Sequence, residues 1–213
     1  MAKLSVAHDY MHIQRVTVSA YTLYLNEKQL PYTGKIDPRT VVIAAMVHEL
    51  GALKYAEDLA ENNKDFGPRR PHSPDTVQHI QHELLFDFLR RLHCPPDVAG
   101  PAALIASLVS FSREVGDKEK IQDHCEAYPA LRFVQDADRL DDLGCVGIAR
   151  LVAEEKGTIL ELVNRIDTSL VHYVGLMKTK GGRKEAEKRW AQMLEFRERL
   201  VGQTDCSVGL KAD

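Results

Sequence analysis

Residues 37–50 read DPRTVVIAAMVHEL, and this stretch indicates the fold class more clearly than any other part of the chain. Asp37 followed by Pro38 is a favoured N-cap and first-turn pair, which predicts a helix from residue 39 to about residue 50. Residues 41–47 are apolar on nearly every side of that helix, and a helix of this kind is buried. The stretch therefore predicts a central helix around which other elements pack.

Helical periodicity continues on both sides of this segment. The sequence predicts further helices over residues 13–25, 54–61, 74–92, 99–112, 131–143, 146–155, 158–177 and 184–201, and the polar stretch 117–127 is compatible with a short helix or an excursion. No window alternates strictly enough to predict a strand. We expect an all-α protein, a single bundle of roughly eight to ten helices. In this prediction residues 1–155 form the core, residues 156–203 form C-terminal helices on the same domain, and residues 204–213 form a loose tail.

Composition narrows the classes of function. The chain has 213 residues and a formal net charge of −3, so no basic field is expected to attract a nucleic-acid polymer. Its four cysteines are widely spaced and form no C-x-x-C pair, which argues against a disulfide framework. The start, MAKLSVAHDYMH, lacks the apolar region of a secretory signal. The apolar runs are far shorter than the roughly 20 residues of a membrane span. We therefore expect a cytoplasmic protein without a membrane partner.

Three polar clusters interrupt the apolar helices. The first is HDYMH at residues 8–12, with Arg15 one turn beyond; the second is His48 with Glu49; the third is DADRLDD at residues 136–142. The carboxylates of the third cluster repel one another unless cations lie nearby. Two imidazoles with carboxylates from separate helices suit a divalent cation, which activates water and polarises a phosphoryl oxygen. Each cluster alone is equally compatible with a structural role: a capping histidine, a hydrogen-bonded core pair, or a solvated acidic face.

Three longer blocks contain these clusters: HDYMHIQRV at residues 8–16, VVIAAMVHELGALKY at residues 41–55, and RFVQDADRLDDLGCVGIAR at residues 132–150. In this order they resemble the signature blocks of the HD-domain superfamily of metal-dependent phosphohydrolases, in its branch of small stand-alone hydrolases. The resemblance spans about residues 6–150. It implies a helical HD domain, with residues 1–155 as its metal-binding core, and hydrolysis of a phosphate ester.

The resemblance also implies a set of metal ligands. His12, His48 and Asp138 match the family's ligand positions, and Glu49 stands where the family has the aspartate of its His-Asp pair. Asp138 is preferred to Asp136 because the family's ligand is the aspartate of the Ala-Asp step. Glu49 is one methylene longer than aspartate, so either the ion shifts or the side chain folds back. The implied cofactor is one divalent ion: Mn, Mg, Co, Ni or Zn.

Catalytic roles follow from the same blocks. Arg15 matches a phosphate-contacting arginine, and Lys54 matches the lysine of the Lys-Tyr dipeptide, which can stabilise phosphate charge. Ala52 departs from the family, since related proteins carry an acidic residue there to orient or deprotonate the attacking water. Glu57 and Asp58 lie one to two turns further on and are the candidates to replace it.

The predicted substrate is a small phosphorylated molecule, with a nucleotide favoured, and the reaction is phosphomonoester or phosphodiester hydrolysis. The alternative, motivated by the two departures, is a degenerate HD domain that binds metal or nucleotide without turnover. A further alternative is a di-iron oxygenase, which needs a second metal at His79 or His82, with His72 upstream. Those histidines are equally compatible with an ordinary helix surface, or with one proton donor facing the site. The oligomeric state stays open, a homodimer included.

Overall fold

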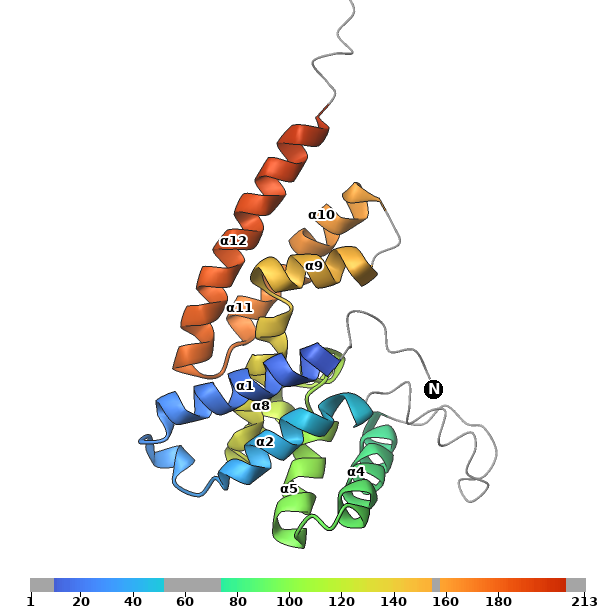
Figure 1. Ribbon diagram of the computed structural model, residues 1–213, viewed down its shortest axis with the longest axis vertical. Helices are drawn as coiled ribbons and strands as arrows, with labels where there is room; N and C mark the ends of the chain where they lie inside the picture. Colours follow the sequence, from blue (N-terminus) through green and yellow to red (C-terminus); the bar gives the residue numbers. More distant parts are fainter. Residues whose placement is uncertain (1–9, 52–73, 155–157, 206–213) are drawn as a thin grey trace, which may run out of the picture.

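The computed structural model describes residues 10–51, 74–154 and 158–205. Across these ranges the chain is helical and contains no strand, which confirms the all-α prediction (Figure 1). The α-helices are α1 (Tyr10–Glu27), α2 (Pro38–Val47), α4 (Pro74–Arg91), α5 (Pro96–Ser107), α6 (Phe111–Gly116), α7 (Lys118–Ala127), α8 (Ala130–Asp141), α9 (Gly144–Glu154), α10 (Ile159–Thr168), α11 (Tyr173–Leu176) and α12 (Lys180–Thr204). Within the described ranges three 3₁₀ turns lie between these helices, η2 (Pro31–Thr33), η3 (His48–Gly51) and η5 (Leu170–His172). None of the described helices combines the length and the apolar character that crossing a bilayer requires.

Helix α2 begins as the sequence predicts. The Asp37 side chain accepts a hydrogen bond from the backbone N–H of Arg39 at 2.8 Å, and Pro38 occupies the first turn. The α-helix ends at Val47, earlier than predicted, and the chain tightens into η3. His48 and Glu49 therefore lie on a 3₁₀ turn at the end of a buried helix.

Helix α8 lies at the centre of the fold. It packs against α1, α2, α5 and α12, and Figure 1 shows α1 and α2 crossing it. Phe133, Val134 and Leu131 of α8 are fully buried and belong to the same apolar core as Val16 of α1. Arg139 is buried in this helix as well, at 1% exposure. Burial of that charge is compatible with folding because the guanidinium is paired and hydrogen-bonded.

The partners of Arg139 link α8 to its neighbours. The guanidinium forms an ion pair with buried Glu114 of α6, which also pairs with Lys178 just before α12. It also donates to the backbone carbonyls of Gln135 at 2.9 Å and Val109 at 3.3 Å. This network ties α6, α8 and the chain before α12 together.

Two predicted helices are each divided in the structure. The predicted helix 99–112 is α5 followed by α6, because the carbonyls of Leu108 and Val109 leave the helix and accept from Gln135 and Arg139 of α8. The predicted helix 158–177 is α10, η5 and α11. There α10 ends at Thr168, whose hydroxyl donates back to the carbonyl of Asn164 in competition with the regular pattern.

Gly144 separates α8 from α9 where the sequence predicts the break, and it adopts φ = +74°. A Cβ there would lie 3.0 Å from Gln192 Oε1 and 3.2 Å from the Arg189 side chain. Gly144→Ala is therefore expected to lower the free energy of unfolding by about 1–3 kcal/mol, measured by urea denaturation. Gly202→Ala is the control, because nothing lies within 4 Å of its Cβ position. Equal stability of the two variants would contradict this account of the turn.

Candidate metal centre

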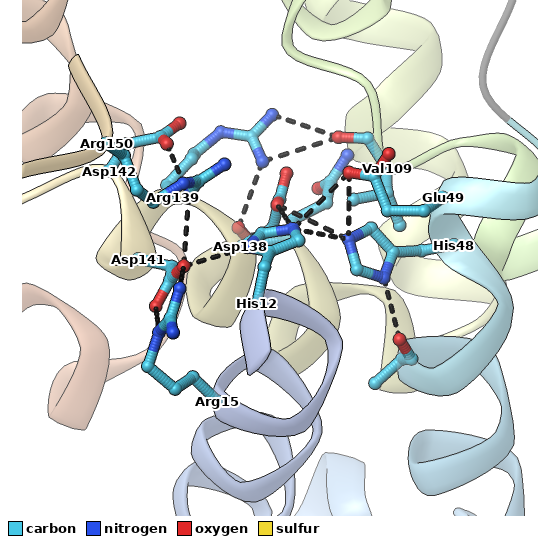
Figure 2. A network of polar contacts seen from close by, with 12 residues as sticks. His12, Arg15, His48, Glu49, Val109, Asp138, Arg139, Asp141, Asp142 and Arg150 are labelled. Carbon is cyan, nitrogen blue, oxygen red and sulfur yellow. Dashed lines mark hydrogen bonds and ion pairs between the residues drawn. The ribbon is translucent and has the colours of Figure 1, made fainter. Parts of the chain in front are cut away.

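Four side chains from three separate elements meet at one point. His12 comes from the first turn of α1, His48 and Glu49 from η3, and Asp138 from α8 (Figure 2). The two Nε2 atoms are 3.2 Å apart, and Glu49 Oε1 lies 3.3 Å from Nε2 of His12 and 3.5 Å from Nε2 of His48. Asp138 Oδ1 lies 3.6 Å and 3.5 Å from the same two nitrogens. The four residues that the resemblance implies as ligands are thus brought together.

These spacings fit a divalent cation. Metal–ligand bonds of about 2.0–2.2 Å put neighbouring ligand atoms roughly 3.0–3.5 Å apart around a tetrahedral or octahedral ion. The measured separations fall in or just above this range, and the four donor atoms all lie within 4.8 Å of one another. Two imidazoles and two carboxylates, without thiolate, suit the borderline to hard divalent ions. The extra methylene of Glu49 does not prevent its carboxylate from reaching the centre.

The rings are oriented by hydrogen bonds on their far sides. His48 Nδ1 lies 2.6 Å from the carbonyl oxygen of Ala45, and because a carbonyl only accepts, this nitrogen carries the proton. His12 Nδ1 lies 2.8 Å from Asp141 Oδ2, where a carboxylate accepts in the same way. In its neutral form each ring therefore turns an Nε2 lone pair toward the cluster, as a metal-binding histidine requires.

The electrostatic environment is strongly negative. Burial lowers the pKa of His12, but its hydrogen bond to Asp141 and the charge of Asp138 help to raise it to about 9. Burial also lowers the pKa of His48, and contact with Asp138 outweighs burial so that this pKa is raised. Burial raises the pKa of Asp138, and contact with His48 outweighs it in the opposite direction. The centre thus favours bound positive charge, which is supplied by protons or by a cation that displaces them.

Asp141 adjoins the centre on the His12 side. Arg15 donates to its carboxylate from Nε at 2.7 Å and from Nη2 at 2.9 Å. Arg150 donates from Nη1 at 3.0 Å and also reaches Asp142 at 2.7 Å. The guanidinium of Arg15 therefore lies on Asp141, outside the cluster of ligands, and its predicted contact with phosphate stays a prediction.

Sequence reasoning missed Asp141 and Arg150. Both stand in the third signature block, so the block contained them, but their partners are set by packing between distant helices. Asp136, weighed as an alternative ligand, is absent from the cluster. Its fully buried carboxylate accepts from the backbone of Lys178 and from both the backbone and the hydroxyl of Thr179. Asp136 therefore anchors the start of α12.

Several predicted residues lie outside the described parts of the chain: His72, Ala52 and the catalytic candidates Lys54, Glu57 and Asp58. His79 and His82 are described, and with Glu83 they form a second group of potential donors on the surface of α4. His82 Nδ1 lies 3.1 Å from Glu83 Oε1, and the Glu83 side chain is 55% exposed. This group shares no residue with the first cluster.

The chain is similar to several known proteins. No family model matches it. The uncharacterized protein YpgQ of Bacillus subtilis (strain 168) is 30% identical over 203 residues, covering 90% of this chain and 82% of YpgQ. The crystal structure of B. subtilis YpgQ in complex with ADP matches with a TM-score of 0.64 and 24% identity, covering 94% of this chain and 91% of that one. An HD-superfamily hydrolase from Bacillus thuringiensis matches with a TM-score of 0.58 and 23% identity, covering 92% of this chain and 86% of that one.

Proposed function

We propose that this chain, which belongs to the same family as YpgQ, is a metal-dependent phosphohydrolase of the HD-domain superfamily and hydrolyses a phosphate ester of a small molecule. In this proposal His12, His48, Glu49 and Asp138 hold one divalent cation: Mn, Mg, Co, Ni or Zn. One observation carries the proposal: two imidazole Nε2 atoms and two carboxylates from three separate elements converge at the spacing of metal ligands.

The chemistry can be divided between the ion and the chain. A bound divalent cation lowers the pKa of a coordinated water and polarises a phosphoryl oxygen. The two histidines present neutral nitrogen donors, and the two carboxylates balance the charge of the ion. Arg15 and Lys54 are proposed to neutralise the phosphate. Glu57 and Asp58 are proposed to orient or deprotonate the attacking water in place of the acidic residue that Ala52 replaces.

A nucleotide is the proposed class of substrate, cleaved as a phosphomonoester or a phosphodiester. The YpgQ crystal structure in complex with ADP supports this choice, because it places a nucleotide on a relative with the same fold. The net charge of −3 agrees with a small ligand rather than a nucleic-acid polymer. A cytoplasmic location stays a prediction, and the oligomeric state stays open, a homodimer included.

The proposal is tested by metal exchange. The protein is stripped of metal with EDTA, and each of the five ions is then added back separately. Each sample is assayed for phosphate release from ribonucleotides and deoxyribonucleotides, and the metal bound to the protein is measured by elemental analysis. We expect hydrolysis only after an ion is restored. An ion bound without turnover of any nucleotide would favour the degenerate domain. Two irons per chain in the purified protein before EDTA treatment, with oxygen consumption, would favour the oxygenase.

The variant Glu49→Asp tests whether the centre binds its ion more tightly with glutamate than with aspartate at this position. Glu49 Oε1 reaches both histidines, so Glu49→Asp withdraws the oxygen by about one C–C bond, well beyond the roughly 0.2 Å that metal–ligand distances tolerate. We expect the affinity for Mn²⁺ or Co²⁺, measured by isothermal titration calorimetry, to fall about tenfold. A large gain in affinity or activity would instead identify Glu49 as a degenerate substitution. Glu187→Asp, on the exposed surface of α12, is the control.

A further inference from the structure

The Asp141 carboxylate accepts charge-assisted hydrogen bonds from two arginines and also lies against the ring of His12. Its side chain is 3% exposed, and its two oxygens face His12 of α1, Arg15 one turn further along α1, and Arg150 of α9. Arg15 uses two N–H groups on the two carboxylate oxygens, which is a bidentate pair. Figure 2 shows Asp141 between the two guanidinium groups, with the His12 ring on its inner side.

This arrangement determines the charge of Asp141. A carboxylate as buried as this one is costly unless it is paired and hydrogen-bonded. Here two N–H groups of Arg15 and one of Arg150 donate to the carboxylate, and these charged donors hold Asp141 in its ionised form. An ionised carboxylate has no proton to donate, so the hydrogen bond to His12 requires a proton on Nδ1 of the imidazole.

We propose that Asp141 is a positioning residue that holds His12 in the tautomer and orientation needed for metal binding, and that Arg15 and Arg150 clamp Asp141 in place. The inference rests on the proposed function, because it takes His12 as a ligand. Asp141 touches His12 rather than the cluster itself, so its effect reaches the ion only through the imidazole. The clamp also joins α9 to α1, because Arg150 belongs to α9 and Arg15 to α1.

Asp142 supplies a matched control for the clamp. It is the next residue in the chain, it accepts a hydrogen bond from the same Nη1 of Arg150 at 2.7 Å, and its side chain is 32% exposed. Figure 2 shows it on the side of Arg150 away from His12. Asp141→Asn and Asp142→Asn therefore each remove one negative charge from Arg150, and only the first removes the carboxylate that faces His12.

The experiment compares metal binding by full-length wild type, Asp141→Asn and Asp142→Asn. We expect Asp141→Asn to weaken Co²⁺ binding about 10–100-fold in calorimetry and to shift the visible absorption of the bound Co²⁺. Asp142→Asn is expected to stay within about threefold of wild type and to keep its spectrum. Long-range ¹H–¹⁵N NMR of the metal-free protein, at a pH where the ring is neutral, should show His12 protonated on Nδ1 in wild type and a mixture of tautomers in Asp141→Asn.

Arg15→Lys keeps the test decisive if Asp141→Asn does not fold. The Arg15 side chain is 33% exposed, so the protein should tolerate the change, and lysine cannot make the bidentate pair. A loss of Co²⁺ affinity of about three- to tenfold is expected. Unchanged affinity and spectrum in Asp141→Asn, or in Arg15→Lys where Asp141→Asn does not fold, would overturn the inference. A wild type that binds Co²⁺ but hydrolyses no phosphate ester would overturn the proposed function alone.

Discussion

Replacing Asp138 by asparagine is expected to lower the affinity for Mn²⁺ or Co²⁺ by at least about a hundredfold while the protein stays folded. The substitution keeps the shape of the side chain and removes its charge. Asp138 Oδ1 lies within 3.6 Å of both Nε2 atoms. The described cluster contains only two carboxylates, so once Asp138 is neutral, Glu49 alone is left to balance the charge of an ion. The amide also presents an N–H₂ group, which cannot coordinate a cation.

The measurement is calorimetry with each ion, together with circular dichroism to verify the fold. Metal-dependent hydrolysis is expected to fall in parallel with occupancy and to recover in part at high ion concentration, because the remaining three ligands are intact. Asp87→Asn, on the exposed surface of α4, is the control for loss of one negative charge. Wild-type affinity in Asp138→Asn would show that the cluster does not use this carboxylate as a ligand.

Asp136→Ala is expected to destabilise the fold and to leave metal affinity nearly unchanged, although Asp136 lies only two residues from Asp138 on the same helix. The substitution should lower the free energy of unfolding by about 3 kcal/mol or more. Asp136 is fully buried and accepts from the backbone N–H of Lys178 at 2.9 Å, and from the N–H and hydroxyl of Thr179 at 2.7 Å each. Alanine leaves these donors buried without an acceptor at the residue that caps α12.

Urea denaturation of Asp136→Ala and Asp138→Asn separates the two roles. We expect the midpoint to fall clearly in the first and to move little in the second, whose side chain is 22% exposed. The folded fraction of Asp136→Ala should still bind one ion with an affinity close to that of wild type. Asp136→Asn keeps one acceptor oxygen and should lose less stability than Asp136→Ala. A metal-binding defect without loss of stability in Asp136→Ala would contradict this assignment.

The sequence predicts the four members of the cluster because each stands in a recognisable block, and the helix cap at Asp37 is a local signal that the structure confirms. The end of α2 is predicted too late, because the apolar run of the helix passes without interruption into the 3₁₀ turn that holds His48. Local patterns thus locate the ligands in the chain but not the conformation of the backbone that presents them.

The environment of the cluster could not be predicted in the same way. Asp141 meets Arg15, 126 residues earlier in the chain, and that contact depends on how α1 packs against α8. The division between α5 and α6 likewise depends on Gln135 and Arg139 of α8, whose side chains take the carbonyls of Leu108 and Val109. These features result from long-range packing, which short-range periodicity does not encode.

The ligand residues come from segments that are remote in the chain, and His12 and Asp138 are 126 residues apart. An unfolded chain cannot gather such donors, so an ion bound at this centre stabilises only the native state. By mass action, an ion at a hundred times its dissociation constant adds about 2.7 kcal/mol to folding. Metal supply would then govern the amount of intact protein that survives proteolysis in the cell, independently of any turnover.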